Sequence, residues 1–270
     1  TEIYGCTDAT ADNYNENANC DDGSCGYCIN NDCSYVPDDN FEQHLINEGY
    51  DNLLDDYVIT SNINTVTVLD LFDKNISDLT GIEDFTALIE LRCSFNQLTS
   101  LDLSNNTALT TLDCSNNQLD SLDVSTNTAL LILKCGGYPD DLKYPSKDSQ
   151  NPLYSLDVSN NTALTYLSCS FNHLTSLDVS QNTNLTSLYC DYNQLTSLDV
   201  STNTALTRLS CAYNQLTSLD VRNGNNTALT FTQFQGNYNL YCIDVDDANW
   251  STSNWTSNID PQHYFSEDCN

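Results

Sequence analysis

The 270-residue sequence predicts a repeat solenoid in which short strands of successive coils stack into a parallel sheet. Three observations lead to this prediction. One pattern recurs at a fixed spacing, apolar residues alternate with period two inside it, and cysteine-rich segments flank the repeats. An open stack leaves its terminal apolar faces uncovered, so we expect a capping segment at each end.

The repeat is 21 residues long and reads L-x-x-L-x-C-x-x-N-x-L-x-x-L-D-[VL]-S-x-N-T-x. Six copies keep this register, and they begin at Leu88, Leu109, Leu130, Leu164, Leu185 and Leu206. A divergent coil precedes them near Val66, and a degenerate coil follows from Leu229. The interval from Leu130 to Leu164 is 34 residues instead of 21, which indicates a 13-residue insertion within residues 136–154.

Each column of the repeat has an expected place in the coil. The Leu and Cys positions alternate, which indicates a strand with one face inward and a spacing of about 4.8 Å between coils. Two asparagine columns can bond the turning backbone through buried amides. They comprise Asn96, Asn117, Asn172, Asn193, Asn214 and Asn237, and then Asn106, Asn127, Asn161, Asn182, Asn203 and Asn226. The L-D-V-S-x-N-T half is too rich in turn residues for a helix, so we expect a mostly irregular, β-turn convex side.

The repeat resembles a bacterial leucine-rich-repeat class with 21-residue units, over about residues 66–240. The resemblance implies a right-handed leucine-rich-repeat solenoid with a parallel sheet on one face. The two caps look like those of secreted or cell-surface proteins of Bacteroidetes-type bacteria. We therefore divide the chain into a Cys-rich acidic module (1–33), a helical N-terminal cap (34–64), the repeats (65–240) and a C-terminal cap (241–270).

The N-terminal cap should contain a short helix. Asp38 or Asp39 can begin it and Gly49 can end it. Its apolar residues are Phe41, Leu45 and Ile46, and Leu53, Leu54 and Tyr57 are expected to form a second amphipathic turn.

The 13 cysteines fall into two groups. Six follow the repeat, and because they replace Leu at an inward position we interpret them as buried apolar residues and not as metal ligands. The others lie at the ends, where disulfides indicate an oxidising, extracytoplasmic location. We expect a Cys242–Cys269 bridge to close the C-terminal cap.

Residues 5–25 resemble a short module, G-C-x-D-x-x-A-x-N-Y-[ND]…D-D-G-S-C, of extracellular bacterial proteins. The resemblance implies a Cys6–Cys25 bridge, which leaves Cys20, Cys28 and Cys33 to form one pair and one free thiol. Oxygen ligands are dense here, and a structural Ca²⁺ could be bound by Asp8, Asn13, Asn15, Asn17, Asp21 and Asp22. The alternative is an acidic, disulfide-tied turn without metal.

The formal charge of −31 makes nucleic acid an unfavourable partner, because the chain would repel phosphates. No apolar run reaches the length of a membrane span, and no signal peptide is visible, so we expect a mature or trimmed product.

Two surfaces are candidates for binding. The first is a line of outward aromatic residues on the repeats, namely Phe95, Phe171, Tyr189, Tyr192 and Tyr213. The second is the insertion, which carries Tyr138, Lys143, Tyr144 and Lys147. The alternatives are that the rings only pack on one another and that the insertion is neutral.

Catalysis has little support, because the three histidines are dispersed and the repeated Asp column gives no pair of distinct environments. The sequence thus predicts a non-catalytic extracellular binding or adhesion module, secreted or on the outer cell surface, that binds a protein. A carbohydrate-binding adhesin and a structural spacer of a larger surface protein are the alternatives.

Overall fold

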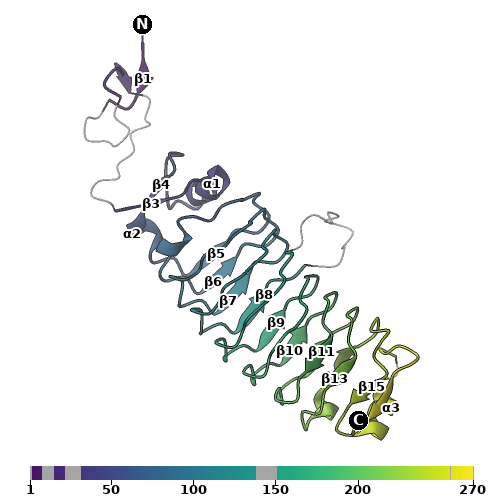
Figure 1. The fold of residues 1–270 in the computed structure, drawn as a ribbon. Helices are drawn as coiled ribbons and strands as arrows, with labels where there is room; N and C mark the ends of the chain where they lie inside the picture. Colours follow the sequence, from purple (N-terminus) through teal and green to yellow (C-terminus); the bar gives the residue numbers. More distant parts are fainter. Residues whose placement is uncertain (1, 8–14, 22–31, 138–150, 256, 270) are drawn as a thin grey trace.

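The computed structural model describes residues 2–7, 15–21, 32–137, 151–255 and 257–269, and it is an elongated stack of coils with the chain termini at opposite ends (Figure 1). The predicted solenoid is confirmed. Among the described residues, no helix combines the length and the apolar character needed to cross a membrane.

The main sheet is parallel and has eight strands, one from each coil, in the order in which the coils follow one another. The strands are β5 (Val68–Asp70), β6 (Glu90–Arg92), β7 (Thr111–Asp113), β8 (Ile132–Lys134), β9 (Tyr166–Ser168), β10 (Ser187–Tyr189), β12 (Arg208–Ser210) and β14 (Phe231–Gln233). Leu91, Leu112 and Leu133 pair in register, as the repeat predicts.

A second, four-stranded parallel sheet was not predicted from the sequence. It consists of β11 (Ser197–Asp199), β13 (Ser218–Asp220), β15 (Cys242–Asp244) and β16 (Tyr264–Ser266). Its strands alternate like those of the main sheet, since Leu198 is buried between exposed Ser197 and Asp199. Elsewhere in the described repeats the convex side is irregular apart from two 3₁₀ turns, η1 (Ile82–Asp84) and η2 (Asn226–Ala228).

The core is a continuous column of Leu, Val and Cys side chains that runs through all the coils. The six repeat cysteines are fully buried and have free thiols, which agrees with their interpretation as apolar residues. Burial raises the pKa of each thiol, and that of Cys135 rises to about 12. These thiols are therefore protonated and unreactive in the folded protein.

The asparagine columns form two buried ladders. In the first, the side-chain oxygen of Asn117 accepts from the Leu98 N–H of the preceding coil, and its amide donates to the Cys93 and Cys114 carbonyls. In the second, the amide of Asn127 donates to the Leu103 and Asn106 carbonyls. Both ladders satisfy backbone groups at the turns, as predicted.

The structure narrows the boundaries of the insertion. Asn151 is buried and takes a place in the first asparagine ladder, and Leu153 and Leu156 continue the coil as core residues. Gly136 and Gly137 also belong to the coil, where their backbone groups bond to neighbouring coils. The extra residues are therefore 138–150, which lie outside the described residues, and not the whole of 136–154.

The N-terminal cap is built from the antiparallel pair β3 (Cys33–Tyr35) and β4 (Tyr57–Ile59) and from helices α1 (Asp39–Asn47) and α2 (Thr60–Ile63). Asp38 caps α1 and also accepts from Ser77 and Asp78 of the first coil, which ties the cap to the solenoid. The turn predicted around Leu53, Leu54 and Tyr57 is wrong. Residues 51–56 form a loop in which Leu54 is exposed, and Tyr57 belongs to β4 and is exposed as well. These side chains therefore do not form the buried apolar face that the turn would need.

The N-terminal module is described only in part. Strands β1 (Tyr4–Gly5) and β2 (Cys20–Asp21) pair in parallel. Cys6 and Cys33 are disulfide-bonded and Cys20 is a free thiol, but Cys25 and Cys28 lie outside the described residues. Asp8, Asn13 and Asp22 of the predicted calcium loop also lie outside, and the Asn15 side chain accepts from the Asn17 N–H. The Cys6–Cys25 pairing and the calcium loop remain predictions.

The C-terminal cap is closed by the predicted Cys242–Cys269 disulfide. Helix α3 (Ala248–Asn254), capped by the Asp247 side chain, packs beside β16. Trp255 covers the last coil with its ring against Phe234 and Phe265. The end of the stack is therefore sealed by aromatic packing, as an open solenoid requires.

Candidate binding surface

Three aromatic side chains from successive coils form a stack that we call the aromatic ladder: Phe171, Tyr192 and Tyr213. The Phe171 and Tyr192 ring centroids are 4.3 Å apart at 15°, and those of Tyr192 and Tyr213 are 4.4 Å apart at 14°. Each residue lies directly before the ladder asparagine, where the chain turns away from the main sheet. The 21-residue register therefore places the rings one above another.

The backbone of the ladder is left-handed. Phe171, Tyr192 and Tyr213 have φ values of 59°, 53° and 53°. Asn116 and Gly236 occupy the same place in other coils with φ values of 52° and 78°, and these are the residue types that tolerate this conformation. A bulky residue there costs about 1–2 kcal/mol, which ring stacking of about 0.5–1.5 kcal/mol per pair offsets in part. Aromatic residues at a strained turn are a reason to expect a functional role.

The ladder borders an open groove of about 780 Å³ on the surface of the stack. The groove is lined by Gln118, Asn151, Pro152, Phe171, Asn172, His173, Tyr192, Asn193, Gln194 and Tyr213. Tyr192 and Tyr213 remain 43% and 42% exposed even though their rings stack, so their edges are available to a partner. The groove thus combines aromatic edges with amide groups and one imidazole.

His173 lies exposed at the edge of this groove and replaces the Gln of the other coils. Its ring is 5.4 Å from that of Tyr154, and its Nδ1 is 3.3 Å from the amide of Gln194. The structure places His173 in the candidate site, two residues after Phe171, although no pattern in the sequence singled it out.

Asp191 supports the ladder from the position before Tyr192. Its carboxylate accepts from the hydroxyls of Ser170 and Ser210 and from the Ala212 N–H. Burial raises the pKa of Asp191, and these hydrogen bonds counteract the rise only in part. The coils from Leu88 onward otherwise have Ser, Gly, Ala or Gln at this place, so a carboxylate here is an exception to the repeat.

We predict that Asp191→Asn stabilises the protein at pH 7. A carboxyl with a raised pKa contributes stability that is fully present below its ordinary pKa and is lost as the pH rises through the raised value. Asparagine removes this loss and keeps an acceptor for Ala212. Thermal melts from pH 3 to pH 8 should show the variant more stable at neutral pH, with the difference narrowing in acid. A difference that grows in acid would contradict the assignment.

The other predicted aromatic residues do not join the ladder. Phe95 is separated from it by the coils of Asn116 and Gly137, and its ring lies 5.3 Å from Phe72. Tyr189 lies on the main sheet between Tyr166 and Phe231, with ring centroids 5.6 and 6.2 Å away. The single line of aromatics predicted from the sequence is therefore divided among three places. Tyr138, Lys143, Tyr144 and Lys147 lie outside the described residues.

The repeated aspartates have a structural role. Asp102 accepts from the Ser104 N–H two residues on, and Asp123 and Asp157 do the same with Ser125 and Ser159. Hydrogen bonds at these turns lower the pKa of the three carboxyls. All six carboxylates of the column have this bond to the backbone, which fits turn formation and offers no paired acid and base.

Comparison with known proteins places the chain in a class. The family described as Leucine Rich repeats (2 copies) matches residues 86–129 and 162–203, which belong to the coils described above. Together with the stacked parallel strands, this makes the chain a leucine-rich-repeat protein with a β-solenoid fold.

Within this class, the repeats are similar to those of internalin J from Listeria monocytogenes serotype 4b (strain F2365). The two are 42% identical over 72 residues, which are 27% of this chain and only 8% of internalin J. The solved functional domain of internalin J, described as including a cysteine ladder, aligns with 86% of this chain and 70% of its own length, at 28% identity and a TM-score of 0.38.

Two further solved structures share the fold. A leucine-rich-repeat protein of Leptospira interrogans is 22% identical, with a TM-score of 0.57 over 76% of this chain and 55% of its own. The internalin inlF of Listeria monocytogenes is 20% identical, with a TM-score of 0.55 over 86% of this chain and 75% of its own. At this identity the likeness extends to the fold alone.

Proposed function

We propose that this protein is a non-catalytic, extracellular binding module and that the groove beside the aromatic ladder holds a protein partner. The observation that carries the proposal is the exposed stack of Phe171, Tyr192 and Tyr213 at a turn where the backbone favours Asn or Gly. Rigid aromatic side chains are frequent anchors in protein interfaces, and solenoids commonly bind proteins along an extended surface.

The ladder favours a protein over a glycan. A sugar ring stacks on the open face of an aromatic ring, but here the faces between Phe171 and Tyr192 and between Tyr192 and Tyr213 are covered by the stacking itself. The edges that remain, with neighbouring Gln118 and Gln194, suit peptide groups and apolar side chains. Carbohydrate binding stays the alternative, through the uncovered ends of the stack or the insertion.

An outer-surface or secreted location supports this function. The disulfide of the C-terminal cap requires an oxidising compartment, and a charge of −31 is compatible with a medium in which cations screen it. We include in this proposal the Bacteroidetes-type origin that the sequence resemblance implies. We also include a role in adhesion.

The direct test is the double variant Tyr192→Asn/Tyr213→Asn. Asparagine keeps the left-handed backbone, as Asn116 does. The free energy of unfolding of the variant should therefore lie within about 1 kcal/mol of that of the wild type. Capture of a partner by cross-linking on host cells should fall at least tenfold, since anchor residues contribute about 2 kcal/mol or more each. The control is Tyr241→Asn/Tyr264→Asn, which removes two exposed tyrosines of the C-terminal cap.

Other outcomes distinguish the alternatives. Equal capture by the wild type and the ladder variant would overturn the protein-binding proposal. A glycan array on which the wild type binds and the ladder variant does not would support the adhesin instead. If the ladder variant and a deletion of 138–150 both leave every cellular phenotype unchanged, the spacer role is favoured.

A further inference from the structure

Three carboxylates of the N-terminal cap converge at one place that the sequence analysis did not single out. Glu42 comes from the first turn of α1, and Asp51 and Asp55 come from the loop between α1 and β4. Their nearest carboxylate oxygens all lie within 4.8 Å of one another. Among the residues that the structure describes, this is the group of acidic, His or Cys side chains close enough to share a metal ion.

Glu42 is fully buried and only half satisfied. Its Oε1 accepts from the backbone N–H groups of Asp55 at 2.8 Å and Tyr57 at 3.2 Å. Its Oε2 is buried without a hydrogen-bond partner, and so is Oδ2 of Asp51. Buried, unpartnered carboxylate oxygens in one cluster of acidic side chains are costly unless something positive lies among them.

The electrostatics of the cluster point the same way. Burial raises the pKa of Glu42 and of Asp51, and the nearby charge of Asp55 raises both further. In the described part of the chain, no Lys, Arg or His forms an ion pair with Glu42 or Asp51. A proton or a bound cation would neutralise the buried charge of these two carboxylates.

We propose that Glu42, Asp51 and Asp55 bind a calcium ion that fastens helix α1 to the loop before β4. Ca²⁺ takes oxygen ligands at about 2.3–2.6 Å, so two ligands of one ion lie at most about 5 Å apart, and the observed 4.8 Å limit fits. Each of the three carboxylates can supply an oxygen, and waters or carbonyls can complete the shell. Mg²⁺ fits less well, because it retains most of its waters and rarely uses a cage of protein carboxylates.

The ion would stabilise the cap as a unit. Helix α1 is tied to the first coil through Asp38, while residues 51–56 lead into β4 and the β3–β4 pair. A cation between the two segments would join the solenoid side of the cap to its outer side. This inference is independent of the proposed function, and it concerns other residues than the calcium loop predicted in the N-terminal module.

Calorimetric titration of the full, metal-free chain with CaCl₂ tests the proposal. The wild type should bind one more Ca²⁺ per chain than the Asp51→Asn and Glu42→Gln variants do. Any Ca²⁺ bound by the N-terminal module would be common to all three proteins. Terbium, which replaces calcium, should luminesce when Tyr50 and Tyr57 are excited, and this signal should fall at least fivefold in Asp51→Asn. The wild type should also melt about 5 °C higher in 2 mM Ca²⁺ than in EGTA, and MgCl₂ should give a smaller rise.

The matched control is Asp56→Asn, which removes the same charge from an exposed neighbour in the same loop. Asp56 has a φ of 69°, which asparagine tolerates, so this variant should keep the full calcium stoichiometry. Equal stoichiometry in the wild type and Asp51→Asn would overturn the proposal, even if Glu42→Gln failed to fold. A wild type that acid stabilises but Ca²⁺ does not would also overturn it, since a shared proton would then neutralise the cluster.

Discussion

Replacing Asn151 with alanine is expected to lower the free energy of unfolding by about 3 kcal/mol. The Asn151 side chain is fully buried, accepts from the Leu119 N–H at 3.0 Å, and donates to the Cys114 and Cys135 carbonyls at 3.0 and 2.9 Å. The Cys114 carbonyl also accepts from Asn117 and the Cys135 carbonyl from Asn172, so each carbonyl would keep one hydrogen bond in the variant. The N–H of Leu119 would be left buried without its acceptor, which is the larger part of the cost. Urea unfolding of the two proteins measures the difference.

Two further variants separate the hydrogen bonds from other effects of the substitution. Asn105→Ala changes an exposed asparagine two coils away and should cost less than about 0.5 kcal/mol. Asn151→Asp keeps the acceptor for Leu119 but turns an oxygen toward two carbonyl oxygens, so it should be at least as damaging as alanine. If Asn151→Ala were as stable as Asn105→Ala, the hydrogen bonds of Asn151 would contribute nothing to the free energy of unfolding.

The repeat positions were predictable because each coil supplies the partners of the next. Once Leu91, Leu112 and Leu133 are aligned in sequence, the strand pairing, the buried Cys column and the asparagine ladders follow from the 21-residue period. The disulfide Cys242–Cys269 was predictable for a different reason, since two cysteines outside the repeat flank the only segment after the last coil. The fold therefore depends on short-range periodicity, which a sequence displays directly.

The candidate site was predictable only in part. Exposure of Tyr192 and Tyr213 follows from alternation along the strand, but their left-handed backbone and mutual stacking depend on the turn that follows it. Asn151 was missed because the insertion moves it 13 places from its expected position, although removing 138–150 restores the period. Residues at a break in the repeat cannot be assigned by counting.

The Glu42–Asp51–Asp55 cluster had no sequence signal of its own. Its members are separated by nine and by four residues and belong to a helix and a loop, so no period brings them together. Only the folded cap reveals that Glu42, which lies on the helix face with buried Phe41 and Leu45, brings a carboxylate into the interior.

Removing the C-terminal disulfide should cost about 3.5 kcal/mol of unfolding free energy in the double variant Cys242→Ser/Cys269→Ser. The bridge closes a loop of sequence separation 27, and the loss reflects the greater freedom of the unfolded chain. Serines are preferable to a reducing agent, because Cys6 and Cys33 are also disulfide-bonded. Urea unfolding, followed by the fluorescence of Trp250 and Trp255 in the same cap, reports the change.

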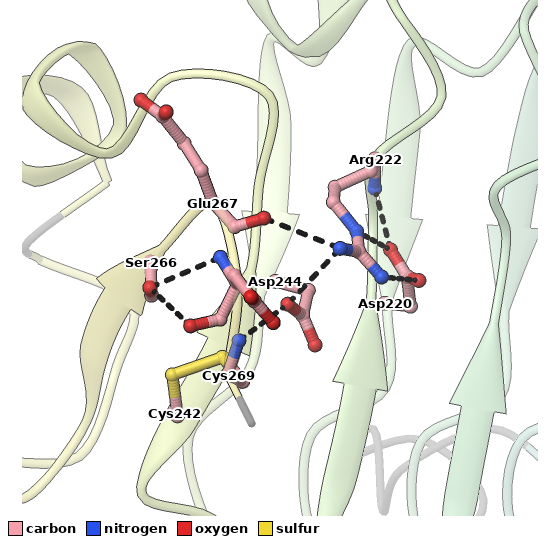
Figure 2. Close-up of a disulfide and its surroundings, with 8 residues drawn as sticks. Asp220, Arg222, Cys242, Asp244, Ser266, Glu267 and Cys269 are labelled. Carbon is pink, nitrogen blue, oxygen red and sulfur yellow. Dashed lines mark hydrogen bonds and ion pairs between the residues drawn. A yellow bond between two sulfur atoms is a disulfide. The ribbon is translucent and has the colours of Figure 1, made fainter.

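The neighbouring ion pairs provide the control for this prediction. Figure 2 shows Arg222 between Asp220 and the segment that carries Glu267, with Asp244 accepting from the Cys269 N–H. Arg222 is partly exposed, so Arg222→Gln should cost less than about 1 kcal/mol. The covalent bridge, and not this network, would then hold the last strand on the stack. Equal losses of unfolding free energy in the two variants would show instead that the ion pairs stabilise the cap as much as the disulfide does. Faster alkylation of the buried Cys211 in the serine variant would show that the last coils open when the bridge is removed.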